Sequence, residues 1–139
     1  MPNITTFNIT DHYIYLPIFI VIGTHKYLEF DAILDTGAPM TEFSDTALQY
    51  AGFLDKVKND VAIKSGLQTQ KYSMVVLPQI KICGHEIKNF KVYVSHFEKS
   101  WGIDALIGLD FFRDYRVTID YSKGILITEP NLTCESKKP

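Results

Sequence analysis

Hydrophobic residues alternate with the two-residue period of β-strands in two stretches, at Phe90, Val92 and Val94 and at Val117, Ile119 and Tyr121. Residues 13–22, YIYLPIFIVI, are uncharged and rich in aromatic and β-branched side chains, as strands are. The turn signal Gly23-Thr24-His25 predicts that residues 27–34 return as the second strand of a hairpin. Further strands are expected over residues 57–63, 71–77, 80–82, 87–94, 116–121 and 125–128.

Two short helices are predicted between these strands. The first covers residues 44–52, where Ser44 is a candidate N-cap and Gly52 is a stop signal. The second follows Gly108, which ends a compact apolar run at residues 105–107. The pattern therefore predicts an all-β fold, mostly β with two short helices.

The length of the chain agrees with one domain over residues 1–139, which is enough for an adequate core. Its ends, residues 1–12 and 131–139, are polar and are expected to be loose. Hydrophobic residues make up 46% and charged residues 22%, which is typical of a soluble globular protein.

The net charge of −2, with scattered Lys and Arg, argues against a nucleic-acid partner, which would need a basic patch. The uncharged run at residues 13–22 is too short to span a bilayer. No basic segment followed by an apolar stretch marks a signal peptide, so we expect a cytoplasmic protein without a membrane span.

The two cysteines, Cys83 and Cys134, do not have the spacing of metal ligands. We expect two free thiols in a reducing compartment, with a disulfide between them as the alternative. The four histidines form no HExxH pattern, so we expect neither a metal nor another cofactor.

One carboxylate stands where a buried strand breaks into a turn. The apolar run at residues 32–34 ends in Asp35-Thr36-Gly37-Ala38. Asp35 offers a general acid or base, Thr36 a hydrogen-bonding hydroxyl, and Gly37 close backbone approach to a ligand. An Asp-Thr-Gly turn is also a common way to end a strand, so the tripeptide alone leaves both interpretations open.

A second element, Leu106-Ile107-Gly108 followed by a short helix, joins the first in a pattern that resembles a known family. With Thr41, the two elements resemble those of retropepsin-like aspartic proteases, the single-domain relatives of pepsin. The resemblance covers about residues 13–129, and ALIGLDFFRDYRVTIDY at residues 105–121 is especially similar to bacterial-type members. It implies a closed acid-protease-type β-barrel equivalent to half of pepsin.

The chain departs from the viral members of that family at two positions. Viral enzymes usually carry an interacting Asp and Arg where this chain has Pro39 and Leu109. Both members of the pair are absent together, so no orphan charge is left. Substrate contacts should therefore not be taken over from the viral enzymes.

The resemblance implies an aspartic endopeptidase that hydrolyses peptide bonds with an activated water. Two carboxylates about 3 Å apart share one proton and so provide a base and an acid together. The chain has a single Asp-Thr-Gly, so the chemistry requires a homodimer that brings Asp35 from each subunit to a two-fold axis. Thr36 would then bond across that axis.

An extended peptide or protein substrate would add to the enzyme as a strand. The substrate-binding candidates are Ser65, Gly66 and Leu67 at the tip of a flap over residues 64–70, and Ile33, Leu106 and Ile107 as apolar subsite walls. The sequence of the flap candidate is equally typical of an ordinary exposed hairpin. The three apolar residues are also typical of a hydrophobic core.

Other functions fit the sequence less well. A phosphatase of the D-x-D-x-T type is excluded because Asp31 and Asp35 are four residues apart. No GxSxG motif or Gly-rich phosphate loop is present. The remaining alternative is a non-catalytic binding or scaffold protein with the retropepsin fold, and the intact Asp35-Thr36-Gly37 argues against it.

Overall fold

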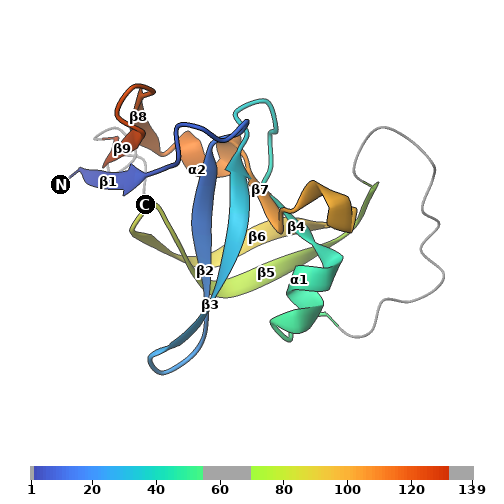
Figure 1. Cartoon of the computed structure of the whole chain (residues 1–139). Coiled ribbons are helices and arrows are strands. Elements are labelled where there is room, and N and C mark those ends of the chain that lie inside the picture. The colour runs from blue at the N-terminus through green and yellow to red at the C-terminus, as the bar shows by residue number, and fades with distance from the viewer. Residues whose placement is uncertain (1, 55–69, 132–139) are drawn as a thin grey trace.

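The computed structural model describes residues 2–54 and 70–131. Figure 1 shows their strands and short helices in chain order. The elements are β1 (Asn3–Thr6), β2 (Tyr15–Gly23), β3 (Lys26–Leu34), β4 (Glu42–Ser44), α1 (Asp45–Tyr50), β5 (Gln70–Ile82), β6 (His85–His96), the 3-10 helix η1 (Lys99–Trp101), β7 (Ala105–Ile107), α2 (Leu109–Phe112), β8 (Tyr115–Asp120) and β9 (Ile125–Pro130).

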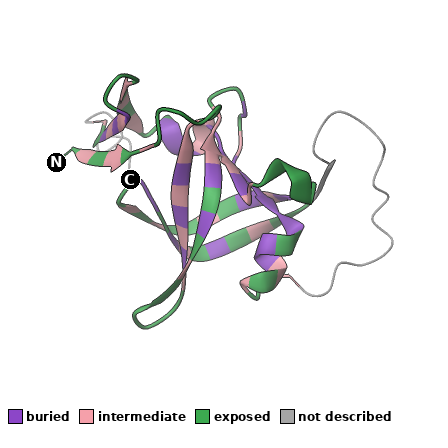
Figure 2. Ribbon diagram, in the orientation of Figure 1, coloured by how far each residue is buried: buried purple, intermediate pink, exposed green. Residues whose placement is uncertain are grey.

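Six strands close into a barrel in the order β2-β3-β7-β4-β6-β5. Strand β2 shows why: Leu16, Ile18 and Ile20 are buried, whereas the residues between them are only partly buried. This alternation is expected where every second side chain of a strand enters the core, and Figure 2 shows buried and less buried residues alternating along β2. The prediction of a mostly β fold with two short helices and a closed barrel is confirmed.

A smaller antiparallel sheet, ordered β1-β9-β8, lies beside one end of the barrel (Figure 1). Strand β1 pairs with β9 from Asn3↔Thr128 to Thr6↔Ile125. The expectation of a loose arm is therefore wrong for residues 3–6. The pairing joins the two ends of the described chain, and local composition cannot reveal a partner so distant in the sequence.

Strands β5 and β6 form a long hairpin around a two-residue turn. Cys83 and Gly84 both have positive φ, +52° and +79°, as the type I′ turn of a tight hairpin requires. The predicted break between residues 71–77 and 80–82 is wrong, because β5 runs on through Pro78 with pairs to β6 on both sides. The strand predicted at residues 57–63 lies outside the described residues.

The first predicted helix forms as α1, capped by Ser44, whose hydroxyl accepts a 3.0 Å hydrogen bond from the Ala47 amide. The short elements β4 and η1 were not predicted. Strand β4 is three residues long and is held between neighbours, parallel to β6 and antiparallel to β7. Within residues 2–54 and 70–131, no helix has the length and apolar character needed to cross a membrane.

Candidate active site

Asp35 stands at the end of β3, beside the end of β7. The two strands pair in parallel, with Ile33 opposite Leu106 and Leu34 opposite Ile107. The Asp35 amide then donates a 2.9 Å hydrogen bond to the Ile107 carbonyl. The structure therefore brings the two sequence elements, Asp-Thr-Gly and apolar-Gly, together at one end of the barrel.

The Asp-Thr-Gly turn is closed by bonds to Asp35 itself. The Gly37 amide donates to the Asp35 carboxylate oxygen Oδ1 at 3.0 Å, and the Ala38 amide donates to the Asp35 carbonyl at 3.1 Å. Asp35 is half-buried, Thr36 and Gly37 are exposed, and Ala38 is buried. The turn thus presents a carboxylate, a hydroxyl and a glycine at the surface of a single chain.

Gly108 allows the second turn to approach the first. A Cβ at this position would lie 2.7 Å from the Ala38 carbonyl oxygen and 2.8 Å from the Met40 carbonyl carbon and oxygen. Real Cβ atoms do not come so close to backbone, so the contact requires glycine. The next residue, Leu109, donates its amide to the Ala38 carbonyl at 2.8 Å.

A polar pair behind the turn was not predicted from the sequence. Thr41 is fully buried, and its amide and hydroxyl donate to the two carboxylate oxygens of Asp110 at 2.9 and 2.7 Å. The Thr41 hydroxyl also accepts a 3.1 Å bond from the Gly108 amide. The sequence does show an acidic residue, Asp110, two positions after Gly108. No Thr-Gly follows Asp110, so its neighbours did not mark it as part of the site.

The apolar subsite candidates differ in exposure. Ile33 and Leu106 are partly exposed neighbours in the β3–β7 register, and Ile33 precedes Asp35 by the two residues that place them on one face. Ile107 is fully buried in the core and presents no surface to a bound peptide. The subsite role expected of Ile107 is therefore not supported. The flap candidates Ser65, Gly66 and Leu67 lie outside the described residues.

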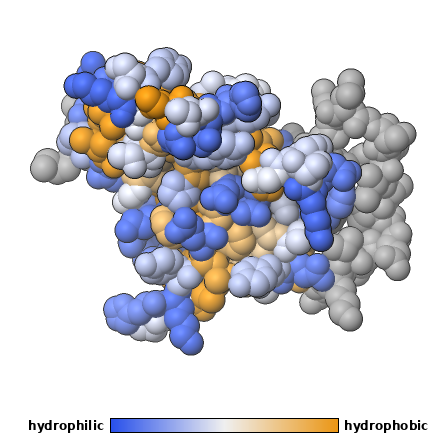
Figure 3. Space-filling model, viewed as in Figure 1, coloured by the Kyte–Doolittle hydropathy of each residue, from blue (hydrophilic) through white to orange (hydrophobic). Residues whose placement is uncertain are grey.

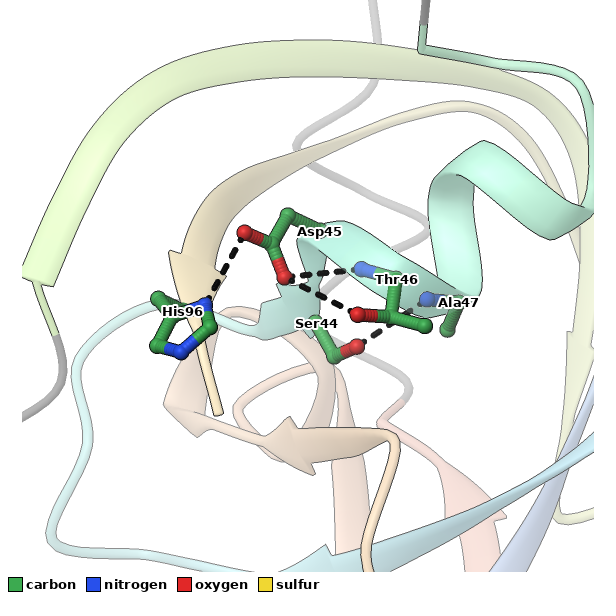
Figure 4. A network of polar contacts seen from close by, with 5 residues as sticks. All are labelled: Ser44, Asp45, Thr46, Ala47 and His96. Atoms are coloured by element: carbon green, nitrogen blue, oxygen red, sulfur yellow. Dashed lines mark hydrogen bonds and ion pairs between the residues drawn. The ribbon is translucent and has the colours of Figure 1, made fainter. Parts of the chain in front are cut away.

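The buried carboxylate of Asp45 anchors the first turn of α1 (Figure 4). Its Oδ1 accepts the Thr46 amide at 2.8 Å, and its Oδ2 lies 3.2 Å from Nδ1 of His96 on β6. The Asp45 side chain is 3% exposed and that of His96 is 31% exposed. This contact ties the first turn of α1 to the end of β6, while the Ser44 cap holds the same turn from within.

The site and the barrel together define the class of protein. A closed six-stranded barrel sets an Asp-Thr-Gly turn against an apolar-Gly turn that is followed by a short helix. This is a retropepsin-like aspartic protease domain. Residues 21–111, more than half of the chain, match the family described as aspartyl protease, and the chain belongs to that family. The resemblance drawn from the sequence is thereby confirmed.

Solved structures share this fold. A retropepsin-like aspartic protease from Rickettsia conorii is similar with a TM-score of 0.62 and 23% identity, over 92% of this chain and 89% of that chain. The retroviral protease-like domain of Ddi1 from Leishmania major gives 0.52 and 20%, over 84% and 88%. The EIAV protease, solved with the inhibitor HBY-793, gives 0.50 and 17%, over 78% and 92%. No match was found among curated protein sequences.

Proposed function

We propose that the protein is an aspartic endopeptidase that works as a homodimer. The observation that carries the proposal is the Asp35-Thr36-Gly37 turn, held by hydrogen bonds to its own carboxylate and to the end of β7 in a barrel of the aspartyl protease family. A pure binding protein would not need this triplet. The hydrogen bonds fix the backbone of this turn. A fixed backbone is needed if the Asp35 carboxylate is to lie close to a second carboxylate.

The partner carboxylate is that of Asp35 in a second copy of the chain. Two such carboxylates near a two-fold axis hold a single proton, so one activates the attacking water and the other protonates the leaving amine. The exposed Thr36 of each subunit bonds across the axis and holds the two turns together. The pair titrates as a unit, so no single pKa belongs to either Asp35.

The substrate is an extended peptide segment of a protein. Its backbone pairs by strand addition, and its side chains rest on the partly exposed Ile33 and Leu106. Ser65, Gly66 and Leu67 are proposed to cover it as a flap.

The decisive experiment replaces the proposed catalytic carboxyl. Asp35→Asn keeps the size and backbone bonding of the turn but cannot ionise, so peptidase activity on denatured casein should fall by at least about a hundredfold. Asp31→Asn is the matched control, because Asp31 is an exposed carboxyl four residues earlier, on β3. The Asp31→Asn variant should retain activity.

The assay is run in mildly acidic buffer at a protein concentration where sedimentation shows dimers. Inhibition by pepstatin-type compounds and insensitivity to metal chelators are expected. Activity that persists in purified, folded Asp35→Asn would refute the mechanism. A dimer that cleaves nothing across a broad peptide library would favour the non-catalytic binding or scaffold alternative.

A further inference from the structure

A buried polar contact between Thr41 and Asp110 lies next to the segment that begins with Asp35. Thr41 has no exposed surface, and both of its polar side-chain roles are used. Its single hydroxyl hydrogen goes to Asp110 Oδ1 at 2.7 Å, and its oxygen accepts from the Gly108 amide at 3.1 Å. The orientation of the Thr41 side chain is therefore determined by these two contacts.

Asp110 receives Thr41 with both carboxylate oxygens. Oδ2 accepts the Thr41 amide at 2.9 Å while Oδ1 accepts its hydroxyl. An ionised carboxylate accepts at both oxygens, whereas an amide side chain offers one acceptor and two donors. Because both oxygens are turned to Thr41, Asp110 is not placed to act as the second catalytic carboxyl.

These contacts complete a set of five hydrogen bonds between two segments, residues 35–41 and 107–110. At one end the Asp35 amide donates to the Ile107 carbonyl, and in the middle the Leu109 amide donates to the Ala38 carbonyl. The three bonds of the Thr41 group close the other end. The segment that begins with Asp35 is thus held at both of its ends.

We propose that Asp110 is a positioning residue, which fixes the Asp35 turn through Thr41 in the geometry that catalysis needs; this rests on the proposed peptidase function. Removing the carboxylate breaks two of the three hydrogen bonds that hold the Thr41 end of the segment, while the other three of the five bonds remain. Asp35 then keeps its chemistry but loses its fixed place relative to the partner subunit. A misplacement of about 1 Å at a reacting group can cost about a hundredfold in rate.

The test compares Asp110→Ala and Asp110→Asn with Asp120→Ala. Asp120 is a suitable control because its Oδ1 also accepts two bonds, from the Ser122 hydroxyl at 2.9 Å and the Lys123 amide at 3.1 Å, in the turn between β8 and β9. Each variant is assayed at a concentration where it is fully dimeric, and kcat and KM are measured separately.

We expect kcat to fall about tenfold or more in Asp110→Ala, with KM changed by less than about threefold. Asp110→Asn, which keeps one acceptor oxygen, should recover part of the loss, and Asp120→Ala should leave kcat near wild type. Folded Asp110 variants with wild-type kcat would overturn the proposal. So would an equal fall in Asp120→Ala. If Asp110→Ala does not fold, Asp110→Asn carries the same comparison.

A second readout does not depend on activity. Hydrogen exchange of the Asp35 and Leu109 amides reports the bonds that join the two segments. Asp110→Ala should speed exchange at these amides and leave the amides of β2 and β6 protected. Unchanged exchange would refute the positioning role even if the wild-type protein cleaves nothing, whereas absent cleavage with faster exchange would refute only the peptidase function.

Discussion

The amide nitrogen of Asp35 lies 2.9 Å from the carbonyl oxygen of Ile107 and donates a hydrogen bond to it. The bond extends the parallel pairing of β3 and β7 by one residue beyond Leu34↔Ile107. The main chain of Asp35 is thus held by the barrel, while its carboxylate accepts the Gly37 amide within the turn. A change confined to the carboxylate, such as Asp35→Asn, should therefore preserve the fold.

Gly108→Ala should damage the site through its backbone. The added Cβ would meet the Ala38 and Met40 carbonyl groups at 2.7 to 2.8 Å, and neither contact is the end of a flexible side chain. We expect a loss of about 1 to 3 kcal/mol in the free energy of unfolding and a large loss of activity. Thermal and urea denaturation measure the first, and casein cleavage the second.

Gly23→Ala is the matched control for that substitution. A Cβ at Gly23 would meet only the Lys26 side chain, at 3.8 and 3.9 Å, which is ordinary contact. Stability and activity of Gly23→Ala should stay near wild type. Equal tolerance of alanine at positions 23 and 108 would contradict the close contact between the two turns.

Cys83 should be an unreactive thiol in the folded protein. It is buried, and burial raises its pKa from 9.0 to about 11, against a smaller lowering by a hydrogen bond with Thr5. At neutral pH, this higher pKa leaves about a hundredfold less thiolate than a thiol with the ordinary pKa would have. In a Cys134→Ser variant, DTNB should react with Cys83 at least about a hundredfold more slowly than in urea. Rapid reaction of the native protein would contradict this burial.

His85 should make the stability of the protein depend on pH. Its ring stacks on Tyr115 with centroids 4.3 Å apart, and its Nε2 lies 2.8 Å from the Thr128 hydroxyl. Burial lowers the pKa of His85 below its usual 6.5, although a hydrogen bond with Thr128 opposes this. As pH falls through 6.5 the unfolded chain takes up the proton first, so the contribution of His85 to stability is present above 6.5 and is lost toward the lowered pKa.

The measurement for His85 is the urea midpoint at about pH 7 and about pH 5. The drop between the two should be smaller in His85→Gln than in wild type. His12→Gln is the control, because His12 is exposed in the loop before β2 and should leave the drop unchanged. An equal drop in wild type and His85→Gln would refute the assignment.

Much of the fold could be predicted because most helices and strands are indicated by the residues within them or next to them. The aromatic and β-branched composition of β2 and the Ser44 cap of α1 are local signals, and both are confirmed. Strand β1 could not be found in this way, since NITT is stabilised by pairing with β9 at the other end of the described chain. At Pro78 the sequence led to a wrong prediction of a break between two strands. Proline is rare inside strands, but here β5 continues through it.

The residues of the candidate site can likewise be divided into those that local sequence reveals and those that it does not. The Asp35-Thr36-Gly37 turn and Gly108 could be found because each belongs to a short run of neighbouring residues that resembles the family's motifs, and at position 108 the close backbone contact requires glycine. The contact of Asp110 with Thr41 could not be found in this way, because Thr41 is distant in sequence and becomes its neighbour only in the folded chain. The burial of Ile107 likewise follows from which face of β7 meets the core.

Homodimeric catalysis makes a prediction about mixtures of subunits. If one active site needs Asp35 from two chains, added Asp35→Asn protein should exchange into wild-type dimers and inactivate them. With complete exchange and equal amounts, only about a quarter of the dimers contain two wild-type chains, so about half of the original activity should remain. A larger excess of Asp35→Asn should suppress it further. Casein cleavage is measured after long pre-incubation, with Asp31→Asn added in parallel as the active control. A rate that stays constant under excess Asp35→Asn, while labelled subunits demonstrably exchange, would show that each chain acts alone.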